Sequence, residues 1–180
     1  MKTFQEGDLE FEFPEQAVPR RFDDSKTHRL THCMKAVDCI FEWGGDTFFL
    51  EIKDPDNPKT QTRGRGQFEN DLQSGVLNSN LTYKYRDSFL YEYASGRVRG
   101  KVHYIVLLCM KSLDSYMLTS RGDELKKYLP LEGPSGPWQK GFVASCAVLN
   151  LEAWKRVFGQ FPVRRLSETS SGTNQSKNSA

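Results

Sequence analysis

The sequence predicts an α/β domain, and three stretches in chain order support this prediction. Two apolar runs flank the Gly-Gly-Asp sequence at 44–46, a pattern typical of a β-hairpin with a tight turn. Residues 67–94 have helical character, and residues 102–109 are apolar on both faces, as in a central strand of a covered sheet. The 180 residues are enough for one domain with a sizeable core, which we expect to span residues 1–166.

The first expected element is a strand at residues 9–13, where apolar and acidic residues alternate. Such alternation is typical of a half-buried or edge strand. We expect the glutamates between residues 10 and 15 to be solvated, although one of them could supply an acidic group to a site elsewhere. Asp23 or Asp24 could also approach such a site, because the segment 20–34 leads directly into the hairpin.

The hairpin at 36–53 brings two acids and a lysine to one face. If the two glycines form the turn, Asp38 lies opposite Glu51, with Cβ atoms about 5 Å apart. If the turn lies one residue later, Asp38 faces Lys53 instead. Either register places Asp38, Glu51 and Lys53 on one face, because strand side chains alternate. The other face would carry the apolar residues Val37, Cys39, Phe41, Phe48, Leu50 and Ile52.

Two adjacent carboxylates repel each other, and an apolar surround raises the cost of ionising both, so the pair favours a bound cation. A site with only two carboxylate ligands from the protein suits Mg²⁺, because this ion takes waters and substrate phosphate oxygens as its remaining ligands. Lys53 could orient or deprotonate an attacking water, or stabilise the charge that develops on a phosphoryl group. The pattern therefore predicts hydrolysis of phosphodiester bonds.

The order of Asp38, a hairpin turn, Glu51, Ile52 and Lys53 resembles the PD-(D/E)xK nuclease superfamily. The resemblance implies a restriction-endonuclease-like fold, with a small mixed β-sheet flanked by helices. It also implies that Asp38 and Glu51 bind Mg²⁺, for which Mn²⁺ could substitute, and that Lys53 is the catalytic lysine. The backbone carbonyl of Ile52 or a further carboxylate would complete the coordination. The match departs from the family pattern at Val37, which stands where proline often precedes the aspartate.

A simpler interpretation of the same residues is a surface ion pair, because Glu-x-Lys is common on solvated strands and contributes little there. On the nuclease interpretation, neither Glu51 nor Lys53 is expected to belong to the core. Alanine at either position would then abolish cleavage without unfolding the chain.

The stretch 54–66 is rich in Pro, Asn, Asp and Gly and is expected to be a loop. Its basic residues Lys59, Arg63 and Arg65 would either clamp phosphates beside the metal site or be solvated. Because the loop leaves from the catalytic end of the hairpin, we treat these three residues as candidates for binding nucleic acid.

The helical stretch 67–94 could form two pieces, with Ser79 as an N-cap and Gly96 as a terminator. Every fourth residue from Leu81 to Tyr93 is apolar or aromatic, which predicts a buried stripe. The resemblance implies that this helix supplies a polar residue to the site. The candidates are Lys84, Arg86 and Gln73, of which Lys84 and Arg86 could also contact nucleic acid; alternatively, Arg86 and Asp87 form a surface pair.

The remaining elements, in order, are a helical region at 112–128 interrupted near Gly122, a strand at 142–149, a helix that Asn150 caps and Gly159 ends, and an edge segment at 161–163. Arg164 and Arg165 are expected to be exposed. Residues 167–180 have no apolar side chain able to anchor them and are expected to form a disordered tail.

The net charge of +2 shows no global basic excess, so any contact with DNA must come from local patches. The four cysteines lack metal-site spacing and are expected to be reduced. The chain has neither a signal-peptide pattern nor an apolar run of about 18 residues, so we expect a cytoplasmic protein without a membrane span.

The expected function is that of a Mg²⁺-dependent nuclease acting on DNA, within a restriction, repair or phage-defence system. Such an enzyme could act as a homodimer or with a partner protein. The alternative is a catalytically inactive subunit that keeps the nuclease fold for binding or assembly in a larger complex. A structural partner without any nucleic-acid role is a third alternative.

Overall fold

A computed structural model describes residues 1–24, 26, 29, 32–60, 62–131, 138 and 141–171. The elements in chain order are β1 (Lys2–Glu6), β2 (Leu9–Phe13), β3 (Arg20–Arg21), β4 (Cys39–Trp43), β5 (Asp46–Lys53), α2 (Thr62–Ser74), α3 (Val76–Ala94), β6 (Val102–Leu108), α4 (Ser115–Lys126), β7 (Ser145–Leu149), α5 (Leu151–Val157), β8 (Val163–Arg165) and α6 (Leu166–Ser171).

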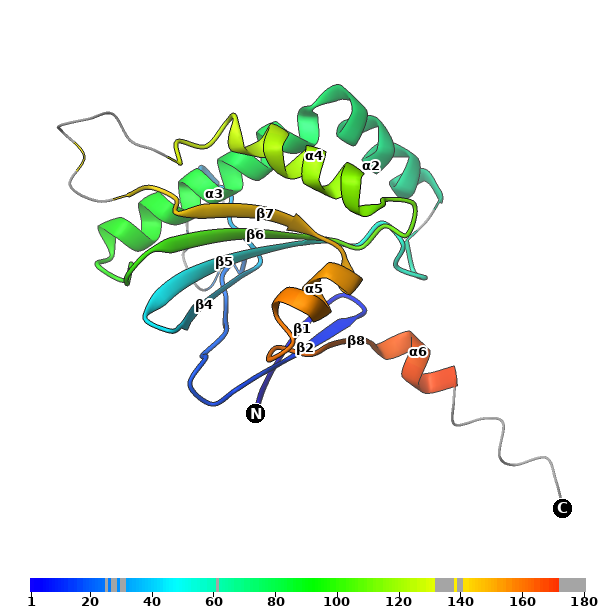
Figure 1. Ribbon diagram of the computed structural model, residues 1–180, viewed down its shortest axis with the longest axis horizontal. Coiled ribbons are helices and arrows are strands. Elements are labelled where there is room, and N and C mark those ends of the chain that lie inside the picture. The colour runs from blue at the N-terminus through cyan, green and yellow to red at the C-terminus, as the bar shows by residue number, and fades with distance from the viewer. Residues whose placement is uncertain are drawn as a thin grey trace, which may run out of the picture.

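The strands form two sheets. The larger has the order β3-β4-β5-β6-β7, antiparallel from β3 to β5 and parallel from β5 to β7, and the smaller has the order β1-β2-β8. Helices α2, α3 and α4 cover one face of the larger sheet, while α5 and the smaller sheet lie on the other (Figure 1). The predicted α/β class is confirmed, with β6 as a central strand. The smaller sheet was not predicted: residues 9–13 form its half-buried middle strand.

The two faces of the larger sheet belong to two separate hydrophobic clusters. Ile40 and Phe49 pack in the cluster under the helices, and Cys39 and Leu50 pack in the cluster against the smaller sheet. Val37 was expected to share the face of Cys39 but lies in the helix-side cluster. The reason is that β4 begins at Cys39, so strand alternation does not extend back to Val37.

The hairpin between β4 and β5 turns at the two glycines, as the first of the two predicted registers requires. Cys39 pairs with Leu50, and Trp43 pairs with Asp46. Gly44 and Gly45 have φ values of 62° and 88°. Positive φ at both central residues is the geometry that matches the twist of a hairpin, and it favours glycine.

The helical stretch forms two helices that meet at Gly75, whose φ is 79°. Helix α2 already begins at Thr62, so the loop after β5 is shorter than the predicted 54–66. The two glycines near the start of α2 have low helix propensity, but burial of Leu72 in the core stabilises the helix. Ser79 is not an N-cap, because α3 begins at Val76. Gly96 does terminate the helix, donating its N–H to the carbonyl of Tyr93.

Three further expectations are corrected. Helix α4 continues through Gly122 because this residue is buried against β7, where a Cβ would lie 3.7 Å from the Val148 nitrogen. The last strand of the sheet begins at Ser145 rather than at 142. Tyr93, at the end of the predicted buried stripe, is 54% exposed. The cap of α5 is as predicted: the Asn150 side chain accepts a hydrogen bond from the Ala153 N–H at 2.8 Å.

Arg165 is buried, although the sequence predicted an exposed side chain. Its guanidinium group donates to both carboxylate oxygens of Asp54, at 2.8 and 2.6 Å. These bonds raise the pKa of Arg165 and connect β8 to the end of β5. Arg164 is exposed, as expected. The bonds between Arg165 and Asp54 join segments that are distant in sequence, so no local sequence pattern could reveal that Arg165 is buried.

The predicted tail begins at Ser167, and the structure has α6 over Leu166–Ser171, whereas residues 172–180 lie outside the described part. The four cysteines form no disulfide; three of them are buried and Cys33 is exposed. Among the described residues, none of the helices combines the length and the apolar character that a membrane crossing requires.

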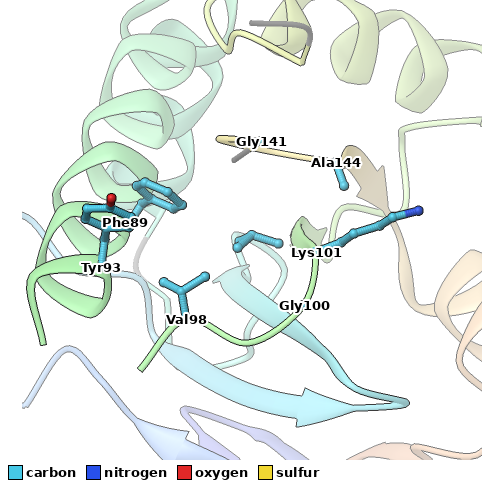
Figure 2. Close-up of a pocket in the computed structure, with 8 residues that line it drawn as sticks. Phe89, Tyr93, Val98, Gly100, Lys101, Gly141 and Ala144 are labelled. Atoms are coloured by element: carbon cyan, nitrogen blue, oxygen red, sulfur yellow. The ribbon is translucent and has the colours of Figure 1, made fainter. Parts of the chain in front are cut away.

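A hollow of about 290 Å³ lies where β6 begins, between the end of α3 and the approach to β7 (Figure 2). It is lined by Phe89, Tyr93, Val98, Gly100, Lys101, Val102, Gly141 and Ala144. Its floor is formed by the connection from α3 to β6, which passes the hairpin turn closely. At Gly100 a Cβ atom would lie 2.2 Å from the carbonyl oxygen of Gly45.

We expect Gly100→Ala to lower the free energy of unfolding by about 2 kcal/mol or more, because the new methyl group would collide with backbone and φ at this residue is +53°. Denaturant titration measures the effect. The matched control is Gly66→Ala in α2, where a Cβ would meet no described atom within 4 Å. That change should stabilise the protein by about 1 kcal/mol, and equal effects at the two glycines would contradict the prediction.

Candidate active site

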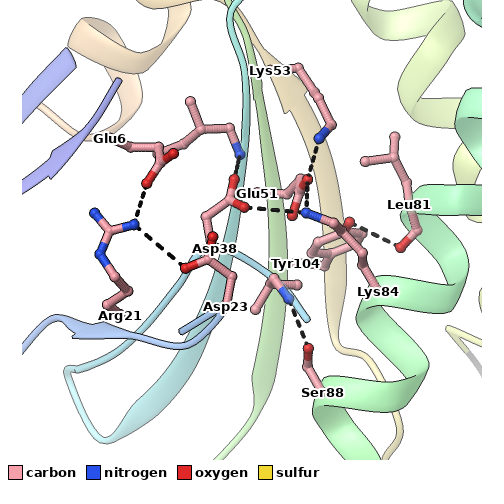
Figure 3. A network of polar contacts seen from close by, with 12 residues as sticks. Glu6, Arg21, Asp23, Asp38, Glu51, Lys53, Leu81, Lys84, Ser88 and Tyr104 are labelled. Carbon is pink, nitrogen blue, oxygen red and sulfur yellow. Dashed lines mark hydrogen bonds and ion pairs between the residues drawn. The ribbon is translucent and has the colours of Figure 1, made fainter. Parts of the chain in front are cut away.

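The two acids and the lysine of the hairpin meet at the end of β5, on the helix-covered face of the larger sheet (Figure 3). Asp38 immediately precedes β4, and Glu51 and Lys53 are near the end of β5. A fourth charged group, the ammonium of Lys84, enters from α3. The structure therefore brings together the three residues that the sequence singled out, with a second lysine between the two acids.

Glu51 is the centre of this group. One of its carboxylate oxygens, Oε1, is 2.7 Å from Nζ of Lys53 and 2.6 Å from Nζ of Lys84. The other oxygen, Oε2, is buried and has no hydrogen-bond partner among the residues that the structure describes. The whole residue has an exposed fraction of 0%, so the expectation that Glu51 lies outside the core is wrong.

Asp38 is held from two sides. Its Oδ1 is 3.2 Å from Nζ of Lys84, and its Oδ2 accepts a hydrogen bond from the Ile52 N–H at 2.6 Å. Asp38 is 5% exposed. Because Ile52 lies between Glu51 and Lys53, this backbone bond fixes the aspartate beside the glutamate. The role of the Ile52 carbonyl as a metal ligand stays a prediction.

Burial, followed by the negative charge of Asp38, raises the pKa of Glu51 from its ordinary 4.5 to about 7, against the lowering effect of Lys53 and Lys84. Burial disfavours the charge of Lys84, but the carboxylates of Glu51 and Asp38 raise its pKa overall. Glu51 is thus a carboxylate whose ionisation is costly in the absence of a further cation.

This shift makes stability depend on pH. Between pH 4.5 and about 7 the folded protein holds a proton on Glu51 that the unfolded chain has lost, so the free energy of unfolding should fall as pH rises through this window. The full loss, reached above pH 7, is about 3 kcal/mol. Denaturant titration of metal-free protein across this range measures it. If the free energy of unfolding instead rose between pH 4.5 and 7, and rose equally in wild type and in Glu51→Gln, the raised pKa of Glu51 would be contradicted.

Asp23 is a third acid near the pair. The Phe22 N–H donates to the carbonyl oxygen of Asp38 at 3.0 Å, which brings the next residue close to the site. Burial and then the charge of Asp38 raise the pKa of Asp23, while Arg21 and Lys84 lower it. Of the two aspartates named from the sequence, Asp23 is therefore the one that shares the electrostatics of the site.

The other acids considered from the sequence have different partners. Asp24 accepts a hydrogen bond from the Lys26 N–H at 2.8 Å, a local turn contact. Glu10 pairs with Arg164, and Glu15 pairs with the N-terminal amine. Glu12 lies with Glu10 on β2 of the smaller sheet.

Of the three candidates on the helices, the structure places Lys84 in the site. Arg86 is exposed and donates to the carbonyl of Tyr128 at 2.9 Å, and Gln73 is exposed on α2. Lys84 lies on the row of α3 that includes Leu81 and Ser88, both buried. A lysine on a core-facing row is the sequence signal that distinguishes it from Arg86.

The basic residues after β5 are partly neutralised. Arg65 lies in α2, 3.2 Å from Asp56 and 3.3 Å from Glu69, and Lys59 is exposed. Arg63 belongs to α2, but its side chain lies outside the described part. Contact of these residues with phosphates stays a prediction.

The described residues contain no group of three or more His, Cys, Asp and Glu side chains arranged to hold a metal ion. Asp38 and Glu51 are the pair that could share a cation, with Asp23 nearby. With two ammonium groups beside two carboxylates, the arrangement can position charge around a small anionic group and assist proton transfer.

Comparison with protein-family models, with curated proteins and with solved structures gave no match for this chain.

Proposed function

We propose that this protein is a metal-dependent nuclease that hydrolyses phosphodiester bonds in DNA. One observation carries the proposal: Glu51 is fully buried beside Asp38, and its Oε2 has no hydrogen-bond partner within the described part of the chain. A buried carboxylate oxygen without a partner is costly, and a bound cation would satisfy it. The resemblance to the PD-(D/E)xK superfamily supports the same assignment.

The donor set fits a hard divalent cation. Asp38 and Glu51 would hold Mg²⁺ or Mn²⁺ through carboxylate oxygens, and the Ile52 carbonyl and Asp23 are candidates for a further oxygen ligand. When bound, the ion would polarise the phosphoryl group and lower the pKa of a coordinated water. A cation would also lower the pKa of Glu51 and so remove the cost of its ionisation.

The two lysines have different tasks in this proposal. Lys53 has a 30% exposed side chain and contacts Glu51 alone of the two acids, so its ammonium can reach a water or the phosphoryl oxygens. Lys84 contacts both acids and is a positioning residue that holds Glu51 and Asp38 together. Lys53 is therefore the catalytic residue and Lys84 supports the geometry.

The fold assignment is part of the same proposal. A five-stranded mixed sheet covered by helices, with the acids at the end of its central strands, supports a restriction-endonuclease-like fold. A role in restriction, repair or phage defence, as a homodimer or with a partner protein, follows from the resemblance.

One observation favours the inactive subunit as the second candidate. Lys84 lies between Asp38 and Glu51, and together with Lys53 it balances the two negative charges without a metal ion. A charge-balanced group of this kind can serve the stability or the specificity of a fold. In that case the protein would bind its partner without cleaving DNA.

Incubation of the purified protein with supercoiled and linear DNA tests the proposal. Cleavage is expected with Mg²⁺ or Mn²⁺ and not with EDTA, and Asp38→Asn should abolish it. Asp123→Asn, on the exposed face of α4, is the matched control and should cleave like wild type. Cleavage in EDTA, or cleavage by Asp38→Asn at the wild-type rate, would contradict the proposal. Absence of both cation binding and DNA cleavage would favour the inactive subunit.

A further inference from the structure

A groove of about 450 Å³ opens directly beside Lys53 and Lys84. It is lined by Lys35, Lys53, Gly64, Gln67, Phe68, Asp71, Leu77, Asn80, Leu81 and Lys84. The residues from α2 and those from α3 each recur at intervals of three and four, so the groove lies between the facing sides of the two helices. Lys53 at the end of β5 and Lys84 of α3 connect it to the candidate active site.

The lining of the groove combines basic and apolar side chains. Three lysines line it, and Asp71 is the one acid among its described lining residues. Asp71 accepts a hydrogen bond from Gln67 Nε2 at 2.8 Å. Buried Leu77 and Leu81 supply apolar surface. Ammonium groups beside apolar side chains suit a ligand with an anionic backbone and flat, weakly polar groups.

Lys35 is an exposed lysine in the lining of the groove. Its Nζ is 2.5 Å from Oδ1 of Asn80, and it lies 5.6 Å from the ring centroid of Tyr83, which is 53% exposed. The backbone N–H of Lys35 donates to Asp87 at 2.8 Å, which fixes this lysine over α3. The groove therefore has an exposed ammonium group in addition to those of Lys53 and Lys84 beside the candidate active site, and such groups attract a phosphate backbone.

We propose that this groove receives one unpaired stretch of the substrate strand next to the scissile phosphate, so that the protein acts on single-stranded DNA rather than within a duplex. The inference rests on the proposed nuclease function. A volume of about 450 Å³ is that of a small-ligand site and holds one nucleotide unit, whose base can enter the groove only when it is unpaired. Phe68 and the leucines contact the base or sugar, Lys35 contacts a phosphate beside the scissile one, and Lys53 reaches the scissile phosphate itself in the transition state.

Fluorescence anisotropy in EDTA, with labelled oligo(dT) of about 15 nucleotides and with the corresponding dA·dT duplex, tests the groove without cleavage. Wild type should bind the single strand at least about 10-fold more tightly than the duplex. Lys35→Glu should weaken single-strand binding about 10-fold and lower the slope of log Kd against log salt by about 1. Asp71→Asn should strengthen binding, because it removes the acid from the groove.

Lys126→Glu and Asp123→Asn on α4 are the matched controls and should bind like wild type. Tighter binding of the duplex, or equal effects of Lys35→Glu and Lys126→Glu, would overturn the inference. Cleavage assays with the same two substrates separate the two proposals. Cleavage of the duplex alone would support the nuclease function and overturn the single-strand inference. If neither substrate is cleaved, the anisotropy measurement still shows whether the groove binds single-stranded DNA.

Discussion

Replacing Glu51 with glutamine should lower Mg²⁺-dependent DNA cleavage about 10³-fold or more, while stabilising the metal-free protein above pH 7. Glutamine keeps the shape of the side chain and its place in the core, but it cannot supply a negative charge to a cation. It also removes a buried carboxylate that burial and Asp38 make costly to ionise. The same change therefore has opposite effects on activity and stability.

The two effects are measured by single-turnover cleavage and by denaturant titration above pH 7. The gain in stability should approach about 3 kcal/mol in EDTA and should shrink when Mg²⁺ stabilises the wild type. Asp123→Asn serves as the control for loss of an acid at an exposed position. A variant that cleaves normally would show that Glu51 has a purely structural role. A variant that is less stable than wild type in EDTA above pH 7 would contradict the raised pKa of Glu51.

Replacing Lys53 with methionine should lower the cleavage rate about 10²- to 10³-fold, because its ammonium acts on the attacking water or on charge that develops in the transition state. The side chain is 30% exposed, so methionine should fit without unfolding the protein. The loss should appear in kcat with little change in KM, because the interaction forms in the transition state. Steady-state cleavage of one short substrate measures both constants.

Lys126→Met, on the surface of α4, is the matched control for loss of a lysine. The proposed role would be wrong if Lys53→Met raised KM and left kcat unchanged, since this lysine would then only bind the substrate. Lys84→Met offers a second comparison, because Lys84 contacts both acids. It should lower the cleavage rate while cation binding stays the same or tightens, because it loosens the two acids and removes a positive charge beside them.

The hairpin and the proximity of its three charged residues followed from local sequence. Two glycines fixed the turn, and strand alternation then placed Glu51 and Lys53 on one face. The same rule placed Val37 wrongly, because alternation holds only where the chain is extended, and β4 begins at Cys39. Local patterns are thus reliable within an element and fail at its boundary.

The parts that the sequence did not predict depend on contacts between distant segments. The smaller sheet pairs β2 with β8, for example Glu10 with Arg164, and neither segment specifies its partner. The burial of Arg165 depends on Asp54, more than a hundred residues away. The selection of Lys84 over Arg86 depends on how α3 is rotated about its axis, which the packing of α2, α3 and the sheet decides together.

Calorimetric titration of the metal-free protein with Mg²⁺ or Mn²⁺ above pH 7 shows whether Asp38 and Glu51 share one divalent cation, as the proposed nuclease requires. Wild type should bind one ion and release a fraction of a proton, since binding lowers the pKa of Glu51 from about 7. Glu51→Gln should bind the ion much more weakly, and Asp123→Asn should bind it like wild type. Undetectable binding by wild type, or the same affinity in Glu51→Gln, would contradict the account.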